Sequence, residues 1–301
     1  MKVAALDLGT NSFLCLIAEV ENSIITKEYS DQVEIVRLGQ DVNRTKMFHP
    51  DALARAEKAL QVFKEKIDFY KPEKIQAYAT SAARDVTNRE VFFDLFKKYQ
   101  IPLEIISGDK EAEFTFFGGI SHLPQRPHYA VVDIGGGSTE IIFGDKTKIN
   151  FAHSFDVGTV RLKEMFLQNE IPTDKEWRNF QDHIQKSWQP YLAKMKVIAD
   201  SDAQLVAVAG TPTEIAKIEI GYFDAEKIDR MTLALNQLET WMAKLSAVPH
   251  ADKISIYGAT PGRADVIAPG VFILLNVMKM LSKTKVTVST KGLRYGIAQK
   301  I

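Results

Sequence analysis

The chain has 301 residues, 46% hydrophobic and 25% charged, which is typical of a soluble globular protein with room for two domains. Its 38 basic and 38 acidic residues cancel, so no global field favours a nucleic acid or a membrane as partner, and an anionic substrate must be held by local groups. Cys15 is the only cysteine, which excludes an internal disulfide, and its apolar neighbours predict a small core residue rather than a nucleophile.

No targeting or membrane-spanning segment is expected. Asp7 interrupts the short apolar stretch at the N-terminus, which argues against a signal peptide. The longest apolar segment, residues 264–281, contains Asp265, Pro269 and Lys279 and predicts a buried helix rather than a membrane span. We therefore expect a soluble, cytoplasmic protein.

The first half of the chain opens with a strand, a tight turn and a second strand. Apolar runs lie on both sides of Asp7 and the polar turn 9–12, and a third extended segment ends near residue 38. A helix follows, with apolar residues at helical spacing from Leu53 to Ile67. Two further strands, near residues 76–82 and 103–108, then run into turns of small residues.

Residues 131–143 repeat this opening, with Asp133 in the place of Asp7 and Ser138 in the place of Ser12. Three consecutive glycines, residues 135–137, allow left-handed backbone angles and a close approach of N–H groups to a ligand. The carboxylate before them can hold a divalent metal that binds phosphate in turn. On this stretch alone, an ordinary glycine-rich hairpin is the alternative.

The order of elements matches across the two halves: three strands joined by hairpins, then helix, strand, helix, strand, helix. Hairpins give antiparallel pairs and crossovers give parallel ones, so we predict an α/β protein with a mixed five-stranded sheet in each half. The polar linker 121–128 places the boundary between domain I, residues 1–123, and domain II, residues 124–301 with helical insertions. Both turns would then open on an inter-domain cleft, and a C-terminal helix at about 291–301 packs back on domain I.

A duplicated fold of this kind resembles the actin-like (ribonuclease H-like) ATPase superfamily. The finer motifs resemble the exopolyphosphatase/guanosine pentaphosphate phosphatase (Ppx/GppA) family in its short, two-domain form, and they occur in the family's order over essentially the whole chain. These motifs are DLGTNSF at 7–13, TSAARD at 80–85, IISGDKEA at 105–112, DIGGGSTE at 133–140, VGTVRL at 157–162, GRADVI at 262–267 and KGLRYG at 291–296. Pro212, Glu214 and Tyr295 depart from the family pattern.

The resemblance implies the site residues. Glu111 would orient or deprotonate the attacking water as the catalytic residue. Mg²⁺, or Mn²⁺ in its place, would be held by Asp7, Asp133 and Glu140, although a solvated edge carboxylate is an equal alternative for Glu140. The phosphate- and substrate-binding residues would be Thr10, Asn11, Ser12, Arg84, Gly135, Gly136, Gly137, Ser138, Thr139, Gly210, Thr211 and Arg263. An ion pair at the surface or at a helix end is the alternative for each arginine, and for Arg263 it is an equal one.

The resemblance also implies a phosphohydrolase that releases the terminal phosphate of inorganic polyphosphate, the 5′ phosphate of guanosine pentaphosphate, or both. Two other functions remain open: a sensor that binds polyphosphate or alarmone without turnover, and an actin-like small-molecule kinase. The sequence does not rank the two substrates, and it leaves a homodimer open.

Overall fold

The computed structural model describes residues 1–301 and divides the chain into two compact units. Unit 1 comprises Met1–Gly118 and Gly292–Ile301, and unit 2 comprises Gly119–Lys291. The C-terminal helix α14 (Leu293–Lys300) thus belongs to the unit that contains the N-terminus. The predicted cleft between the domains stays a prediction.

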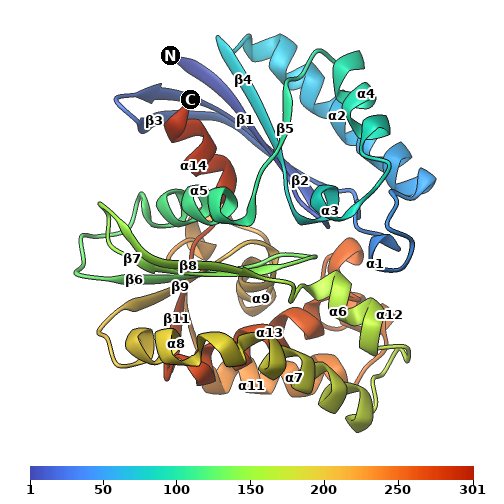
Figure 1. Cartoon of the computed structure of the whole chain (residues 1–301), viewed down its shortest axis with the longest axis vertical. Helices are drawn as coiled ribbons and strands as arrows, with labels where there is room; N and C mark the ends of the chain where they lie inside the picture. The colour runs from blue at the N-terminus through green and yellow to red at the C-terminus, as the bar shows by residue number, and fades with distance from the viewer. The chain divides into compact units, whose positions relative to one another are not determined.

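Unit 1 is built on a five-stranded sheet in the order β3-β2-β1-β4-β5 (Figure 1). Its antiparallel strands are β1 (Lys2–Leu8), β2 (Ser12–Glu21) and β3 (Ile24–Ile35). Strands β4 (Lys74–Ala79) and β5 (Leu103–Ile105) run parallel to β1. The mixed sheet predicted for the first half is therefore confirmed.

Helices cover both faces of this sheet. They are α1 (Val42–Thr45), α2 (Pro50–Tyr70), α3 (Ser81–Asp85), α4 (Glu90–Lys98), α5 (Gly108–Ile120) and α14. On one face, the predicted apolar side of α2 packs into a core with Cys15, whose burial, with a smaller effect of Asp31, raises the pKa of the thiol to about 12. On the other face, Phe114 of α5 and Leu293 of α14 pack over Ala5 and Leu16.

Helices α5 and α14 approach each other at glycines. A Cβ at Gly118 would lie 2.2 Å from the carbonyl oxygen of Gly292, and one at Gly296 would lie 2.0 Å from that of Phe114. Any side chain at either position would push the two helices apart. The close approach holds the C-terminal helix against the helix that carries Glu111.

Unit 2 has a six-stranded sheet in the order β10-β11-β9-β6-β7-β8. Strands β6 (Tyr129–Ile134), β7 (Thr139–Gly144) and β8 (Ile149–Phe155) form the second pair of hairpins. Strands β9 (Gln204–Val208) and β11 (Lys285–Val288) are parallel to β6, and β10 (Thr232–Ala234) adds an antiparallel edge strand. The five predicted strands are present, and the sixth lies within the longer second half.

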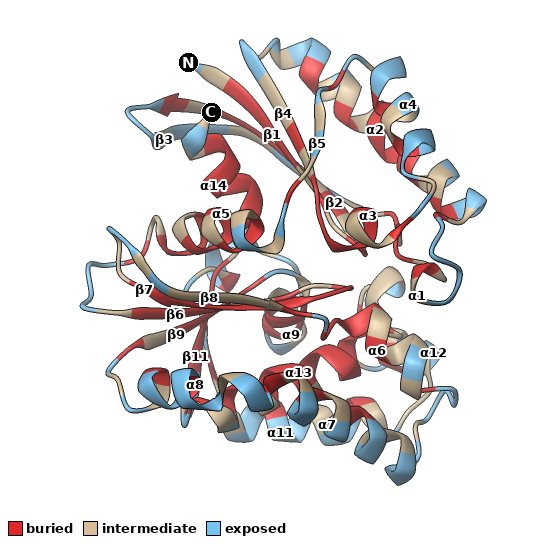
Figure 2. Cartoon of the chain, in the orientation of Figure 1, coloured by how far each residue is buried: buried red, intermediate tan, exposed pale blue.

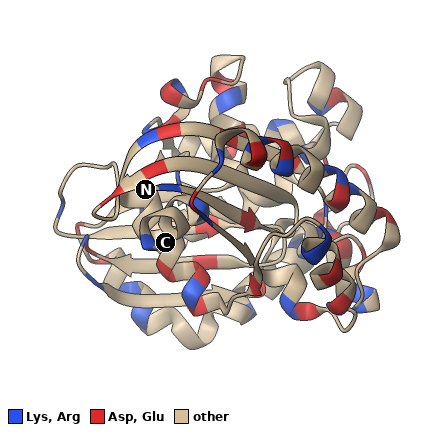
Figure 3. Cartoon of the chain, turned by 90° about the horizontal axis from the view of Figure 1, so that it is seen from above, with Lys and Arg blue, Asp and Glu red and all other residues tan.

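The helices of unit 2 form one large core with one face of its sheet, and Figure 2 shows α13 as mostly buried. This apolar helix confirms the buried helix expected near residues 264–281, and no helix of the chain could cross a membrane. Acidic and basic residues are interspersed over the elements (Figure 3). The helices are α6 (Thr159–Phe166), α7 (Asp174–Trp188), η1 (Gln189–Tyr191), α8 (Leu192–Ala199), α9 (Gly210–Ile220), α10 (Ala225–Ile228), α11 (Leu235–Ser246), α12 (His250–Ser255), η2 (Pro261–Arg263) and α13 (Ile267–Met280).

Candidate functional site

The predicted site residues of unit 1 gather at one edge of its sheet. Strands β1, β4 and β5 are parallel, so their carboxyl ends meet at the same edge, where α/β proteins commonly bind ligands. Asp7 lies at the end of β1, Thr80 follows β4, and α5 with Glu111 follows β5. A hydrogen bond from the Thr80 N–H to the Leu8 carbonyl, 3.4 Å long, joins two of these ends.

The carbonyl groups of the turn between β1 and β2 accept hydrogen bonds from the segment that follows β3. The Gly9 N–H closes the turn on the Ser12 carbonyl at 3.0 Å. The segment after β3 then donates to its carbonyls, Gly39 to Thr10 at 2.8 Å and Arg37 to Asn11 at 2.8 Å. In a trans peptide, the N–H points away from the C=O of the same peptide unit, so the Asn11 N–H faces away from this segment and is available to an anion.

The glycine turn of unit 2 is tied in the same way. The Gly135 N–H closes on the Ser138 carbonyl at 2.9 Å. The first residues of α6 donate to the carbonyls of Gly135 and Gly136 at 2.9–3.0 Å, and Arg161 Nε donates to that of Gly137 at 2.7 Å. By the same peptide geometry, the N–H groups of Gly136, Gly137 and Ser138 point to the other side. Both turns therefore present backbone donors of the kind that bind phosphate.

The backbone angles of this turn differ from those that its glycines allow. Gly135 does not take a left-handed angle; the glycines with positive φ are Gly221 and Gly258. Close approach instead requires glycine at residue 158, the N-cap of α6, since a Cβ there would lie 2.3 Å from the carbonyl carbon of Gly137 and 2.4 Å from the oxygen of Gly136. The turn therefore does not use the left-handed angles that its glycines allow, whereas the second expected property, closely placed N–H groups, remains available.

Glu111 is a buried carboxylate in the first turn of α5, with 7% of its surface exposed. Its backbone N–H donates to the Ser107 carbonyl at 3.0 Å, which fixes the start of the helix. Burial raises the pKa of Glu111, although the nearby Arg84 charge and hydrogen bonds from Arg84 and Thr80 act in the opposite direction. A carboxylate with a raised pKa is a better base near neutral pH than an ordinary glutamate.

Arg84, predicted to bind phosphate, contacts Glu111 directly. Its Nη1 donates to Glu111 Oε2 at 2.7 Å and to the Ile106 carbonyl at 3.0 Å. Arg84 lies in α3, directly after β4, whereas Ile106 and Glu111 follow β5. One guanidinium nitrogen thus joins two neighbouring ends of the sheet, and the Nε and Nη2 groups make no hydrogen bond to the protein.

The three candidate metal ligands lie in two different settings. Asp7 and Asp133 are partly exposed and occupy matching positions near the ends of β1 and β6. Glu140 is 1% exposed and accepts a hydrogen bond from Ser154 Oγ on β8. The solvated-edge alternative for Glu140 is therefore wrong. No group of three His, Cys, Asp or Glu side chains comes together in the chain.

The predicted contacts after β9 are occupied by protein groups. Arg263 Nη1 lies 3.3 Å from the Gly210 carbonyl and 3.4 Å from Glu214 Oε2, and a Cβ at Gly210 would lie 3.3 Å from the Arg263 Cζ. Thr211 packs on α13, where a Cβ at Gly270 would lie 2.1 Å from the Thr211 Oγ1. In the glycine hairpin, the Thr139 hydroxyl likewise donates to the Val157 carbonyl.

The departures from the family pattern have structural roles. Glu214 is 2% exposed and accepts hydrogen bonds from the Thr260 N–H at 2.7 Å and from Lys217 Nζ at 3.1 Å. Pro212 lies in the first turn of α9, where the absence of an N–H costs little. The Tyr295 hydroxyl donates to Glu28 at 2.8 Å on β3.

Next to Tyr295, Arg294 Nε and Nη2 bind the two oxygens of Asp31 at 2.7 and 2.6 Å. Burial alone would lower the pKa of Arg294, but the attraction of Asp31 raises it. These contacts attach the C-terminal helix to β3.

Two residues of this region escaped the sequence interpretation. The sequence motif assigned no role to Arg161, whose side chain donates a hydrogen bond to the Gly137 carbonyl of the glycine turn. Ala209, the last residue before α9, has φ 69° and ψ −160°, a region that is otherwise almost exclusive to glycine. A single sequence gives no signal for the Arg161 hydrogen bond or for the Ala209 backbone angles, because both depend on how a following segment is oriented.

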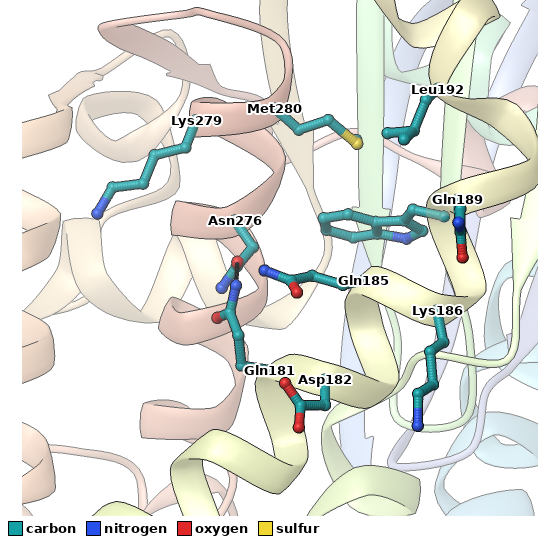
Figure 4. A pocket seen from close by; sticks show the side chains of 10 residues that line it. Gln181, Asp182, Gln185, Lys186, Gln189, Leu192, Asn276, Lys279 and Met280 are labelled. Carbon is teal, nitrogen blue, oxygen red and sulfur yellow. Dashed lines mark hydrogen bonds between the residues drawn. The ribbon is translucent and has the colours of Figure 1, made fainter.

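A separate pocket of about 620 Å³ lies in unit 2 between α7 and α13 (Figure 4). Figure 4 shows Gln181 and Asn276 side by side at one end, joined by a hydrogen bond of 2.7 Å, and Leu192 near Met280. None of the predicted site residues lines it. The candidate functional residues therefore lie at the two turns and around Glu111, outside this pocket.

Two mixed sheets, each opening with a tied strand–turn–strand hairpin, define a protein of the actin-like fold. The chain belongs to the Ppx/GppA phosphatase family, whose model matches residues 16–301. It is 33% identical to exopolyphosphatase 2 of Mycobacterium tuberculosis, over 99% of this chain and 97% of that protein.

Two further proteins place the chain within the family. It is 29% identical to the guanosine-5′-triphosphate,3′-diphosphate pyrophosphatase of Vibrio vulnificus, over 99% of this chain and 59% of that protein. Among solved structures, an exopolyphosphatase from Cytophaga hutchinsonii matches with a TM-score of 0.89 at 26% identity, over 98% of this chain and 96% of that one. The family resemblance and the fold class expected from the sequence are confirmed.

Proposed function

We propose that this protein is a phosphoanhydride hydrolase that releases the terminal phosphate of polyphosphate, the 5′ phosphate of guanosine pentaphosphate, or both. The observation that carries the proposal is the buried carboxylate of Glu111 at the carboxyl edge of a parallel strand set, with a raised pKa. Membership of a phosphatase family and relatives named for these two activities support it.

The proposed roles follow from the chemistry of the groups. Hydrolysis needs a positioned water and donors for the phosphate oxygens. Glu111 would orient the water and accept its proton, because a buried carboxylate with a raised pKa is suited to general base catalysis. The N–H groups of Asn11, Gly136 and Gly137, with the hydroxyls of Ser12 and Ser138, would bind phosphate oxygens.

Mg²⁺ usually binds one or two carboxylates and completes its shell with waters and substrate phosphates. Asp7 and Asp133 fit that pattern, since each is partly exposed and directly precedes a turn with outward N–H groups. A bound Mg²⁺ would neutralise charge on the phosphate oxygens. Glu140 fits less well because it is buried and bonded to Ser154. Thr139, Gly210, Thr211 and Arg263 stay proposed substrate contacts, and their present partners would have to share them.

The decisive experiment compares phosphate release from long polyphosphate, short polyphosphate, guanosine pentaphosphate and ATP, with Mg²⁺ and with Mn²⁺. We expect turnover of at least one of the first three, and a loss of about 10²–10⁴-fold in kcat for Glu111→Gln, the usual contribution of a general base. An unchanged unfolding temperature would show that this variant folds. Full activity of Glu111→Gln would contradict its proposed role.

The same assay distinguishes the two other functions. Tight binding of guanosine pentaphosphate without phosphate release would identify a sensor, and phosphorylation of an added acceptor by ATP would identify a kinase. The departures at Pro212, Glu214 and Tyr295 left a sensor open. Glu214 and Tyr295 lie in contacts that hold elements together, and Pro212 lies in the first turn of α9. They therefore give the sensor no support of their own.

A further inference from the structure

Arg84 and Glu111 form a pair whose partners come from different connections of the sheet. The Nη1 atom of Arg84 lies 2.7 Å from Glu111 Oε2 and 3.0 Å from the carbonyl oxygen of Ile106. The Arg84 side chain is 25% exposed and that of Glu111 is 9% exposed. Because Nη1 is also anchored to a backbone carbonyl, the guanidinium has a fixed position against the carboxylate.

We propose that Arg84 is a positioning residue for Glu111, which orients the carboxylate toward the attacking water and keeps it ionised. The inference rests on the hydrolase function proposed above. It reassigns Arg84 from the direct phosphate contact that the sequence motif implied. An ionised carboxylate has about four acceptor sites in total. Those that the protein donors do not occupy are sufficient to accept a hydrogen bond from a water beside the arginine.

Arg84 is the positive charge that keeps the buried carboxylate of Glu111 ionised. Burial raises the pKa of Glu111, and the effects that oppose it come from the Arg84 charge, the Arg84 hydrogen bond and the Thr80 hydroxyl. The neighbouring cation on the same helix, Lys110, is bonded to Glu104 at 2.9 Å, and Asp109 and Glu113 on that helix carry the same charge as Glu111. Without the arginine, a buried carboxylate tends to take up a proton, and a protonated acid cannot accept one from water.

A direct phosphate contact would have different consequences. In that case the loss of Arg84 weakens substrate binding, so KM rises while the pH dependence of kcat stays as it was. A positioning role instead lowers kcat and moves its acid limb to higher pH, because the pKa of Glu111 rises when the opposing positive charge is removed. The titration of the substrate phosphates is common to all variants and cancels in this comparison.

The experiment measures kcat and KM against pH for the wild type, Arg84→Gln and Arg84→Lys, with the substrate that the wild type turns over fastest. We expect Arg84→Gln to lose about 100-fold in kcat at neutral pH, the effect of a misplaced catalytic group, and its acid limb to shift upward. Arg84→Lys keeps the charge, so its acid limb should stay closer to the wild type. A raised KM with an unshifted acid limb would overturn the inference.

A double-mutant cycle supplies the second readout. If Arg84 acts through Glu111, then Arg84→Gln causes no further loss of kcat in a Glu111→Gln background. Multiplying losses would instead show two independent roles and would also overturn the inference. Failure of the hydrolase function is distinguishable, since then the wild type releases no phosphate from any substrate. If Arg84→Gln does not fold, Arg84→Lys takes its place in the double-mutant cycle, where it should cause no further loss of kcat in the Glu111→Gln background, and multiplying losses would overturn the inference.

Discussion

The turns of the two units share one backbone arrangement but differ in the segment that ties them. In both, the first N–H closes the turn on the carbonyl three residues later, and a segment after the third strand donates to the turn carbonyls. In unit 1 that segment is an irregular stretch around Gly39, whereas in unit 2 it is the N-terminus of α6. The middle residues of the turns differ, Thr10-Asn11 against Gly136-Gly137, so the hydrogen bonds to the turn carbonyls are repeated independently of those side chains.

The buried glutamates of the two units differ in the hydrogen-bond donors that surround them. Glu111 receives one hydrogen bond from an arginine, at 2.7 Å. Glu214 receives bonds from Thr260, Lys217 and Arg263 on both of its oxygens. A carboxylate surrounded by donors is fixed in place, whereas Glu111, with Arg84 and the Thr80 hydroxyl as its donors, retains an acceptor site for a water. The comparison favours Glu111 over Glu214 as the carboxylate that contacts a water.

The largest expected effect is the loss of stability when alanine replaces the glycine that packs against the turn of unit 2. In Gly158→Ala, the new Cβ would lie 2.3–2.5 Å from backbone atoms of Gly136 and Gly137, which cannot move without breaking the turn. In Gly39→Ala, it would meet the Cγ2 of Thr10 at 2.2 Å. We expect Gly158→Ala to lower the free energy of unfolding by about 3 kcal/mol or more, the upper part of the range for overpacking, as measured by urea denaturation.

The matched control tests whether the obstacle in unit 1 is the side chain alone. Thr10→Ser removes the Cγ2 atom, and the other atoms of residue 10 near the new Cβ lie 3.5 Å away, at ordinary contact distance. The double variant Thr10→Ser/Gly39→Ala should therefore recover most of the stability lost in Gly39→Ala. Equal losses in Gly39→Ala and Gly158→Ala, with no recovery, would contradict the distinction between the turns.

A smaller effect is expected from the second glutamate. Glu214→Gln keeps the shape of the side chain but replaces charge-assisted hydrogen bonds with neutral ones and removes the charge that faces Arg263. We expect a loss of about 1–3 kcal/mol in the free energy of unfolding, as for other weakened hydrogen bonds to charged groups. Its kcat should fall far less than that of Glu111→Gln, because Glu214 supports the loop at Thr260.

The measurement compares urea midpoints and kcat for both variants under the same conditions. Glu111→Gln should show the larger change in kcat and Glu214→Gln the larger change in the urea midpoint. The reverse pattern would assign the chemistry to unit 2.

The order of elements was predictable because long, periodic segments determine it. The hairpins around Asp7 and Asp133 and the apolar face of α2 are local patterns, and the structure has them all. Strand β10 escaped prediction because its three residues, Thr232–Ala234, are too few to show alternation. It forms by pairing with β11, which lies about 50 residues further along the chain.

The candidate site was predictable only as a set of residues. Glu111 and Arg84 both come from motifs, but their contact joins residues 27 positions apart, and no local periodicity encodes such a pair. The three glycines of the turn allow left-handed angles that the structure does not use, whereas the need for glycine at residue 158 comes from its close approach to that turn. Contacts made by tertiary packing were therefore the part that local rules could not supply.

The smallest predicted effect concerns the strain that distinguishes the fourth strand of each half. Ala209, after β9, has φ 69° and ψ −160°, whereas Thr80, after β4, has φ −116° and ψ −140°. A non-glycine residue with the backbone angles of Ala209 costs on the order of 1–3 kcal/mol of folding free energy. Glycine would remove this strain, but it also makes the unfolded chain more flexible, which cancels part of the stabilisation.

Ala209→Gly should accordingly raise the free energy of unfolding by about 1 kcal/mol, which corresponds to roughly 2–4 °C in Tm for chains of this size class. Thr80→Gly is the matched control and should be destabilising, because Thr80 is buried and its backbone angle needs no glycine. Differential scanning calorimetry on both variants measures the contrast. If Ala209→Gly lowered Tm as Thr80→Gly does, the strain would not exist, and the close approach of Arg263 to Gly210 would remain as the distinctive feature of this strand end.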